Sequence, residues 1–166
     1  MMAKITTIPL SIAMLLLSLD RVASYDKALE QQNLDKNEAK WDSYYMESTG
    51  SGCGYVMKYS RICFCMPDYL GPFQVVVNST HQVVNAVYLA GRDGDLAGTY
   101  ASIEDMNLIT VEDAFETIQK ALDENAADLS VTYDPTGGYP SKVSVDWDRR
   151  IADEETFFTI ENLILL

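Results

Sequence analysis

The order of helical and strand-like patterns along the chain is the feature that most constrains its fold. Residues 26–48 are rich in helix-forming residues and carry one apolar stripe, and residues 111–127 repeat apolar residues on one face. Three runs typical of strands follow each of these predicted helices. The predicted strands are about 55–65, 73–78 and 83–90 after the first helix, and about 129–133, 142–147 and 156–163 after the second. This order predicts an α+β fold of two consecutive units, each a helix plus three antiparallel strands.

The connection between the two units has neither the length nor the composition of a linker between domains. No Gly/Pro-rich linker of domain-separating length lies there, and residues 91–98 have the composition of a polar loop. We therefore expect a single domain over residues 25–166, with one antiparallel sheet covered by two helices on one face. Two small subdomains side by side would produce the same periodicities. The start of the second helix is well marked, because Thr110 is a typical N-cap with Asp113 three residues on.

Residues 1–24 have the pattern of a secretory signal peptide rather than of a part of the fold. A lysine precedes an apolar run over residues 8–19 that is too short for a typical membrane span. Val22 and Ser24 place small residues at the −3 and −1 positions of a cut after Ser24. We therefore expect a mature chain that begins at Tyr25 and is secreted or lumenal. An uncleaved anchor helix or a buried N-terminal helix is the alternative.

The charge of the chain argues against several classes of partner. Twelve Lys and Arg against 25 Asp and Glu give a formal net charge of −13. This charge repels nucleic acid and anionic lipid headgroups, so we expect no nucleic-acid partner and no membrane attachment after signal cleavage. One His and three Cys are a small supply of groups for metal, nucleophilic or proton-transfer chemistry. We therefore expect no catalytic residues and no cofactor, which makes the chain a non-enzyme.

An exported chain is expected to use its cysteines for structural disulfide bonding. Cys53, Cys63 and Cys65 are odd in number, so one of them must be left over. Side chains two apart in a strand point to the same face, and a bridge between Cys63 and Cys65 would require the extended backbone to distort. Cys53 could instead pair with either one. Free thiols and a redox or metal-binding couple are the alternatives, although a zinc site needs four ligands and His81 is the only imidazole.

A turn between two predicted strands carries the chain's only Asn-x-Ser/Thr sequence, at residues 78–80. If the host adds N-linked sugars, Asn78 is the expected glycosylation site, because a hairpin turn would be exposed. The alternative is an unmodified Asn in a turn. His81 follows directly, and we expect its side chain to be solvated, since a lone His in a turn usually is.

Acidic residues near the C-terminus form a candidate site for a hard cation. Asp146, Asp148, Asp153 and Glu154 lie at and after the end of a predicted strand, and calcium prefers such oxygen ligands. Their spacing fits no loop template such as the EF-hand, and a run of charges is usually a solvated face. We expect these carboxylates to be solvated or to cap turns. Calcium binding by the four residues is the alternative.

A set of short motifs in one order resembles a single family, domain of unknown function 6174, found mostly in exported bacterial proteins and lipoproteins. The motifs are Trp41 with Tyr44, Tyr-Ser-Arg-Ile-Cys-Phe-Cys at 59–65, Thr-Val-Glu-Asp-Ala-Phe at 110–115, Tyr-Asp-Pro at 133–135, Gly-Tyr-Pro at 138–140 and Ile-Ala-Asp-Glu-Glu at 151–155. The resemblance spans roughly residues 41–163. The chain departs from the family in Cys53, in the glycine-rich insertion around it, and in a signal without a lipobox cysteine, so lipid anchoring is not expected. The family has no established activity, and the resemblance implies an exported fold without a mechanism.

These observations together predict a secreted, non-catalytic domain that binds a protein partner through an acidic and aromatic surface. Tyr133, Tyr139 and Trp147 near the turn at 134–140 are the expected contact residues, because Tyr and Trp are enriched at interfaces. The alternative is that these three side chains complete the core. Extracellular calcium binding is the second candidate function.

Overall fold

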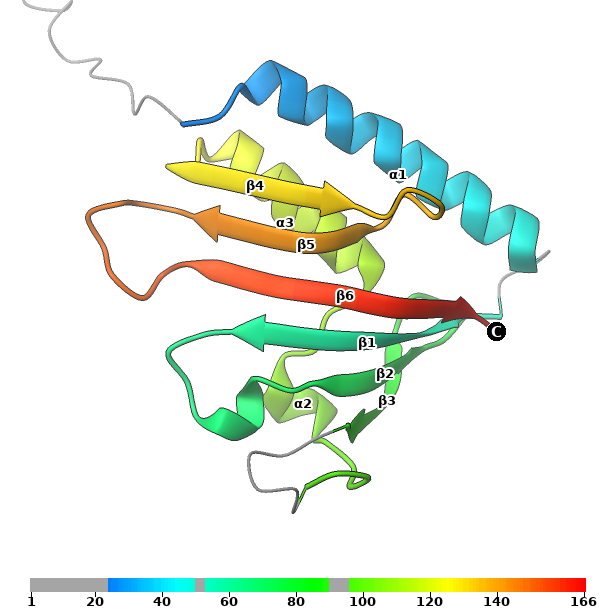
Figure 1. Ribbon diagram of the computed structural model, residues 1–166. Helices are drawn as coiled ribbons and strands as arrows, with labels where there is room; N and C mark the ends of the chain where they lie inside the picture. Colours follow the sequence, from blue (N-terminus) through cyan, green and yellow to red (C-terminus); the bar gives the residue numbers. More distant parts are fainter. Residues whose placement is uncertain (1–23, 50–52, 90–95) are drawn as a thin grey trace, which may run out of the picture.

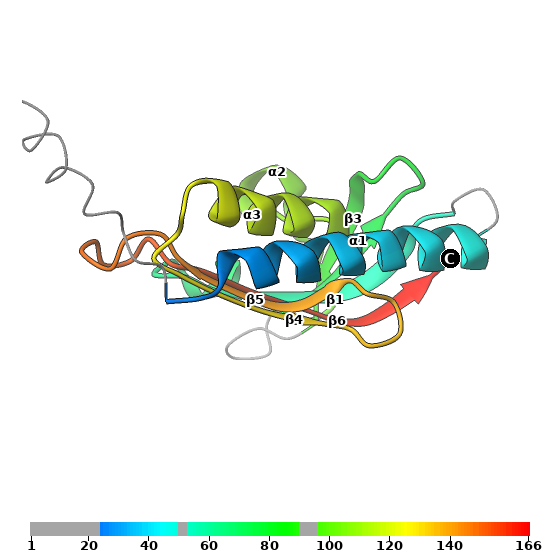
Figure 2. The same ribbon diagram turned by 90° about the horizontal axis from the view of Figure 1, so that it is seen from above.

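A single antiparallel sheet organises the chain in the computed structural model, which describes residues 24–49, 53–89 and 96–166. The elements in chain order are α1 (Lys27–Thr49), β1 (Tyr55–Ile62), the short 3-10 helix η1 (Pro67–Tyr69), β2 (Phe73–Val77), β3 (Val83–Tyr88), α2 (Ile103–Met106), α3 (Val111–Asp123), β4 (Asp128–Tyr133), β5 (Pro140–Asp146) and β6 (Thr156–Leu165). The six strands lie in the order β3-β2-β1-β6-β5-β4 (Figure 1). Both long helices, α1 and α3, lie on one face of the sheet (Figure 2). The predicted α+β fold is confirmed.

The two helix-plus-three-strand units share one sheet because the first strand of the chain pairs with the last. Within each unit, consecutive strands pair as antiparallel neighbours. Strand β6 then returns to lie beside β1, with Tyr59 opposite Ile160. This long-range pairing decides between the two arrangements that the periodicities allowed, and excludes separate subdomains.

The core lies between the sheet and the two long helices. On β1, Tyr55, Met57 and Tyr59 point toward the helices and are at most 3 % exposed. The buried face of α3 supplies an apolar stripe, and its first turn carries the capping box that Thr110 and Asp113 predict, with side chain and backbone bonded in both directions. The opposite face of the sheet is polar in part, with an ion pair of 2.7 Å between Lys58 and Glu161.

Helix α1 is attached to the sheet mainly through aromatic side chains. It is polar over most of its surface, and Trp41 is its largest buried side chain, at 2 % exposed. The indole ring packs with its centroid 5.5 Å from those of Tyr45 and Tyr55 and 6.0 Å from that of Tyr139. Its N–H donates to Oε1 of Glu112 over 3.1 Å. A helix with so few buried residues depends on each of them for its place on the sheet.

The carboxylate of Glu112 joins α3 to three other parts of the fold. In addition to the Trp41 indole, it accepts from the hydroxyl of Tyr55 over 2.9 Å and lies 2.7 Å from Nδ1 of His81. Burial raises the pKa of the Tyr55 hydroxyl, and the negative charge of Glu112 raises it further. His81 also packs on Tyr45 with ring centroids 5.3 Å apart. The His81 side chain is 41 % exposed, as expected for a residue in a turn. Its contacts with Glu112 and Tyr45 were not predicted, because the β2–β3 turn meets α3 only once the sheet has formed.

Three predicted elements end earlier than their sequence patterns suggested. Strand β1 ends at Ile62 rather than at 65, where a disulfide takes the chain out of the sheet. Helix α3 ends at Asp123 rather than at 127, because Asn125 has a left-handed φ of 53° that stops the helix. Strand β3 ends at Tyr88, and residues 90–95, which include the predicted end of this strand and most of the predicted polar loop, lie outside the described residues.

Strand β6 is longer than expected and ends at Leu165 rather than at 163. The register between β1 and β6 shifts between Val56 and Lys58, and Asn162 has a φ of 52° at the matching point of β6. This irregularity lets pairing continue to the end of the strand, with Tyr55 opposite Leu165. The other predicted boundaries lie within two residues of the observed ones, which is the usual uncertainty of an element end. Within the described ranges, no helix has the length and hydropathy needed to cross a membrane.

Candidate functional site

A groove opens on the helix-covered side of the sheet, where β1 ends and β6 begins. Its volume of about 350 Å³ is within the range of small-ligand pockets. Strands β1 and β6 form its floor, α3 and the connection before it form one wall, and the segment after β5 forms another. We call it the strand-end groove and define it by Tyr59, Arg61, Asn107, Lys120, Trp147 and Phe158.

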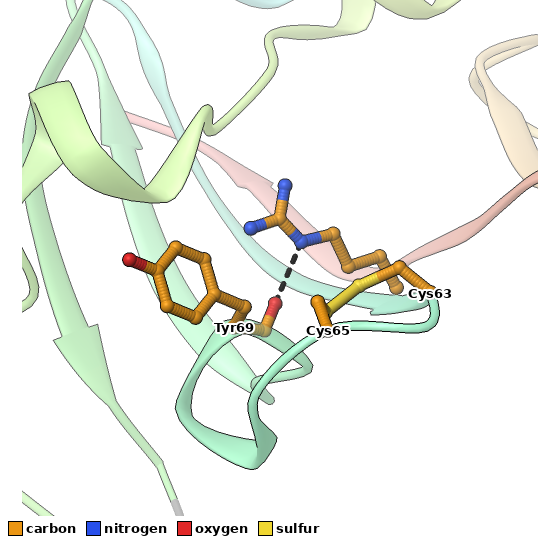
Figure 3. Close-up of a disulfide and its surroundings, with 4 residues drawn as sticks. Cys63, Cys65 and Tyr69 are labelled. Atoms are coloured by element: carbon orange, nitrogen blue, oxygen red, sulfur yellow. Dashed lines mark hydrogen bonds between the residues drawn. A yellow bond between two sulfur atoms is a disulfide. The ribbon is translucent and has the colours of Figure 1, made fainter.

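Arg61 reaches the groove because of the alternation of β1. Tyr59 points inward and is buried, so Arg61, two residues on, lies on the same face just where the helices no longer cover the strand. Its Nε donates to the carbonyl oxygen of Tyr69 over 2.6 Å, and its guanidinium carbon lies 5.7 Å from the centre of the Tyr69 ring (Figure 3). No carboxylate of the described residues forms an ion pair with it. The guanidinium is thus held in place by Tyr69, and no carboxylate in the described part of the chain neutralises it.

The turn that holds Tyr69 is closed by a disulfide between Cys63 and Cys65, with Cα atoms 5.2 Å apart (Figure 3). Cys63 also lines the groove. Cys53 is unpaired and exposed. The alternative in which Cys53 pairs with Cys63 or Cys65 is thereby contradicted. Cys53 precedes β1 and Cys63 follows it, so the strand holds these two residues roughly 25 Å apart at about 3.3 Å per residue. The backbone distortion that a direct bridge requires coincides with the end of the strand.

Lys120 and Trp147 form the wall opposite Arg61. Lys120 extends from the last turns of α3, and its ammonium lies 5.2 Å from the centre of the Trp147 ring. The same ammonium lies 4.0 Å from Glu124, one turn further along the helix. The indole N–H of Trp147 donates to the hydroxyl of Thr156 over 3.1 Å. These contacts fix Trp147 as a rigid aromatic surface.

The charge of the strand-end groove has the opposite sign to that of the whole chain. Two cations, Arg61 and Lys120, and one carboxylate, Glu155, line it, although the chain carries a formal charge of −13. Burial raises the pKa of Tyr59 to about 12, while the nearby Arg61 lowers it. The Tyr59 hydroxyl therefore stays neutral at physiological pH. Cationic donors between aromatic walls are the elements of a site for an organic anion.

The acidic residues of the C-terminal segment are not brought together. Asp148 accepts two bonds from the Arg150 guanidinium, of 2.9 and 2.6 Å, and Asp153 lies in the following turn. Asp146 and Glu154 each bury one carboxylate oxygen that no described group hydrogen-bonds. Among the residues that the structure describes, no three His, Cys, Asp or Glu side chains form a group that could hold a metal ion. The geometry thus adds no support to the calcium alternative.

The three expected contact residues do not form one patch. Tyr139 is 8 % exposed and packs on Trp41, so it belongs to the core. Tyr133 stacks on Phe115 with centroids 6.5 Å apart and is partly buried. Trp147 follows the other end of β5 and lines the strand-end groove. The length of β5 separates Trp147 from both tyrosines, and of the three only Trp147 is placed to meet a ligand in this groove.

Arg61 and Lys120, which the structure places in the groove, were not among the site residues predicted from the sequence. A signal for Arg61 was present: it occupies an inward position of a strand whose other inward residues are aromatic or apolar. A charge at such a position is unusual and points to a special role. Lys120 gave no such signal, because it is one of many charged residues on the exposed side of a helix.

Asn78 lies at the start of the β2–β3 turn, as expected from the sequence. Its Oδ1 accepts the backbone N–H groups of Thr80 and Gln82, over 3.0 and 2.9 Å, and the Thr80 hydroxyl over 2.8 Å. Its Nδ2, the atom to which an N-linked sugar is attached, has no hydrogen bond to a described residue.

A family model described as a family of unknown function, DUF6174, matches residues 33–165. This range includes all six strands, α3 and most of α1. No curated protein and no solved structure matches the chain significantly.

Proposed function

We propose, from the premise that the chain belongs to the DUF6174 family of unknown function, that it is an exported, non-catalytic module that binds a protein partner. In this proposal the strand-end groove receives an anionic group of the partner. The proposal rests on the state of the Arg61 guanidinium. Tyr69 holds this group in place, and no described residue forms an ion pair with it, although the chain is strongly acidic.

The electrostatics of the groove favour binding of an anion. A charge-assisted hydrogen bond from Arg to a carboxylate is stronger than a neutral one, and the planar guanidinium can donate two such bonds in parallel. Arg61 is already oriented by the Tyr69 carbonyl and ring, so little side-chain entropy is lost on binding. The acidic surroundings repel anions elsewhere on the surface, which adds selectivity for this one position.

Export is supported by two features of the chain. Residues 1–24 have the composition of a signal peptide, and Cys63 and Cys65 form a disulfide of the kind that persists in oxidising compartments. Tyr25, the expected first residue of the mature chain, packs on the core and donates from its hydroxyl to Ala121 over 3.4 Å. A cut after Ser24 therefore keeps this contact. In a host that glycosylates, the exposed turn at Asn78 is the proposed position of a sugar.

The proposed function is tested by capturing partners with the immobilised exported protein from the secreted fraction of its host. We expect the captured amount of at least one protein to fall about tenfold or more when Arg61 is replaced by Gln, because a charged hydrogen bond contributes about 1.5–3 kcal/mol. Lys58→Gln is the matched control, since Lys58 lies on the same strand but on the opposite face and pairs with Glu161. Equal capture by all three proteins would contradict the proposal.

A further inference from the structure

We propose that the group recognised by the strand-end groove is the free C-terminus of a polypeptide whose last side chain is aromatic or large and apolar. This inference rests on the proposed function and adds to it the chemical identity of the partner's contact. Charge, size and wall composition of the groove each support it.

The charge of the groove fits a single carboxylate. The Nε of Arg61 is used by the Tyr69 carbonyl, which leaves the two terminal nitrogens of the guanidinium to donate in parallel to the two oxygens of a carboxylate. Lys120 is partly compensated by Glu124, and Glu155 on the rim carries a negative charge. A group with two or three negative charges, such as a phosphate, would therefore be less well balanced than a carboxylate.

The size of the groove fits one terminal residue. Its volume of about 350 Å³ is near the lower end of the range of small-ligand pockets, which suits one residue better than an extended peptide. A C-terminal residue carries its carboxylate and its side chain on the same Cα atom, so both can enter a groove of this size together.

The walls of the groove fit an apolar last side chain beside the carboxylate. Trp147 presents its ring on one side, where its hydrogen bond to Thr156 and the ammonium of Lys120 hold it. Phe158, which is 2 % exposed, closes the floor. Aromatic walls of this kind add contact area for an aromatic or large apolar side chain. Asn107 at the rim supplies an amide for the last peptide group.

The inference is tested by calorimetric titration of the full exported protein with four probes. These are N-acetyl-Gly-Gly-Phe as the free acid, the same peptide as the C-terminal amide, N-acetyl-Gly-Glu-Gly amide with an internal acid, and inorganic phosphate. We expect saturable binding of the free acid and at least tenfold weaker binding of the other three. Binding of the amide, the internal acid or phosphate with the affinity of the free acid would overturn the inference.

Variants separate a failure of the inference from a failure of the proposed function. Arg61→Gln is expected to weaken binding of the free acid at least tenfold, Arg61→Lys by less, and the control Lys58→Gln not at all. Lys120→Gln leaves the Tyr69 contact of Arg61 intact, so it tests the groove even if Arg61→Gln loosens the turn. We expect Lys120→Gln to weaken binding of the free acid several-fold. If phosphate or the internal acid binds best and depends on Arg61, the inference falls and the proposed function stands. If no probe depends on Arg61, both fall.

Discussion

Replacing Trp41 by alanine is expected to lower the free energy of unfolding by about 3–5 kcal/mol, the usual cost of removing a large aromatic side chain from a core. Trp41 is 2 % exposed, contacts the rings of Tyr45, Tyr55 and Tyr139, and donates to Glu112. The substitution opens a cavity and removes one of the donors of a partly buried carboxylate. Because whole domains are stable by only about 5–15 kcal/mol, this change alone is expected to bring the protein close to unfolding.

The effect of Trp41→Ala is measured by urea denaturation followed by far-UV circular dichroism, which does not depend on the lost indole. Met46→Ala is the control on the same helix, because Met46 is 62 % exposed and its truncation is expected to change stability by less than about 0.5 kcal/mol. A loss below about 1 kcal/mol for Trp41→Ala would show that α1 does not depend on this contact.

Replacing Gly54 by alanine is expected to lower the free energy of unfolding by about 3 kcal/mol, at the upper end of the cost of local backbone strain. Gly54 has a φ of 92° just before β1, and an added Cβ would lie 2.1 Å from the carbonyl oxygen of Val77. It would also lie 3.0 Å from backbone atoms of Asn78. Both neighbours are backbone atoms, so relief requires β1 to move relative to the start of the β2–β3 turn.

Gly98→Ala is the matched control for Gly54→Ala. Gly98 has a similar φ of 81°, but an added Cβ would meet no atom of the described residues within 4 Å. The control therefore carries only the cost of placing a side chain at positive φ, about 1 kcal/mol. The difference between the two losses, measured by thermal and urea unfolding, isolates the steric contact with β2. Equal losses of unfolding free energy for the two variants would show that the contact with β2 does not restrict Gly54.

Features set by short stretches of sequence were predictable in this protein. Helix α3 is specified locally, because Thr110 and Asp113 form its capping box and the next turns repeat apolar residues on one face. The strand cores followed equally well from alternation. Local patterns were less informative at the ends of elements, as in β1, where the Cys63–Cys65 bridge ends a run that continues to look like a strand in the sequence.

Features set by contacts between distant segments could not be predicted from local patterns. The pairing of β1 with β6 joins the first strand of the chain to the last, and the contact of His81 with Glu112 joins a turn to a helix start. The strand-end groove likewise combines a strand end, a helix and a loop. Its residues are unremarkable one by one in the sequence, with the exception of the inward charge at Arg61. Only the assembled sheet brings them together.

We propose that the domain binds its ligand in the strand-end groove. The most direct measurement is a map of chemical-shift changes in the ¹H–¹⁵N spectrum of the labelled protein during titration with N-acetyl-Gly-Gly-Phe free acid. We expect changes centred on Arg61, Lys120 and the indole N–H of Trp147. Changes centred on the opposite face of the sheet, around Lys142 and Thr159, or no changes at saturating peptide, would contradict it.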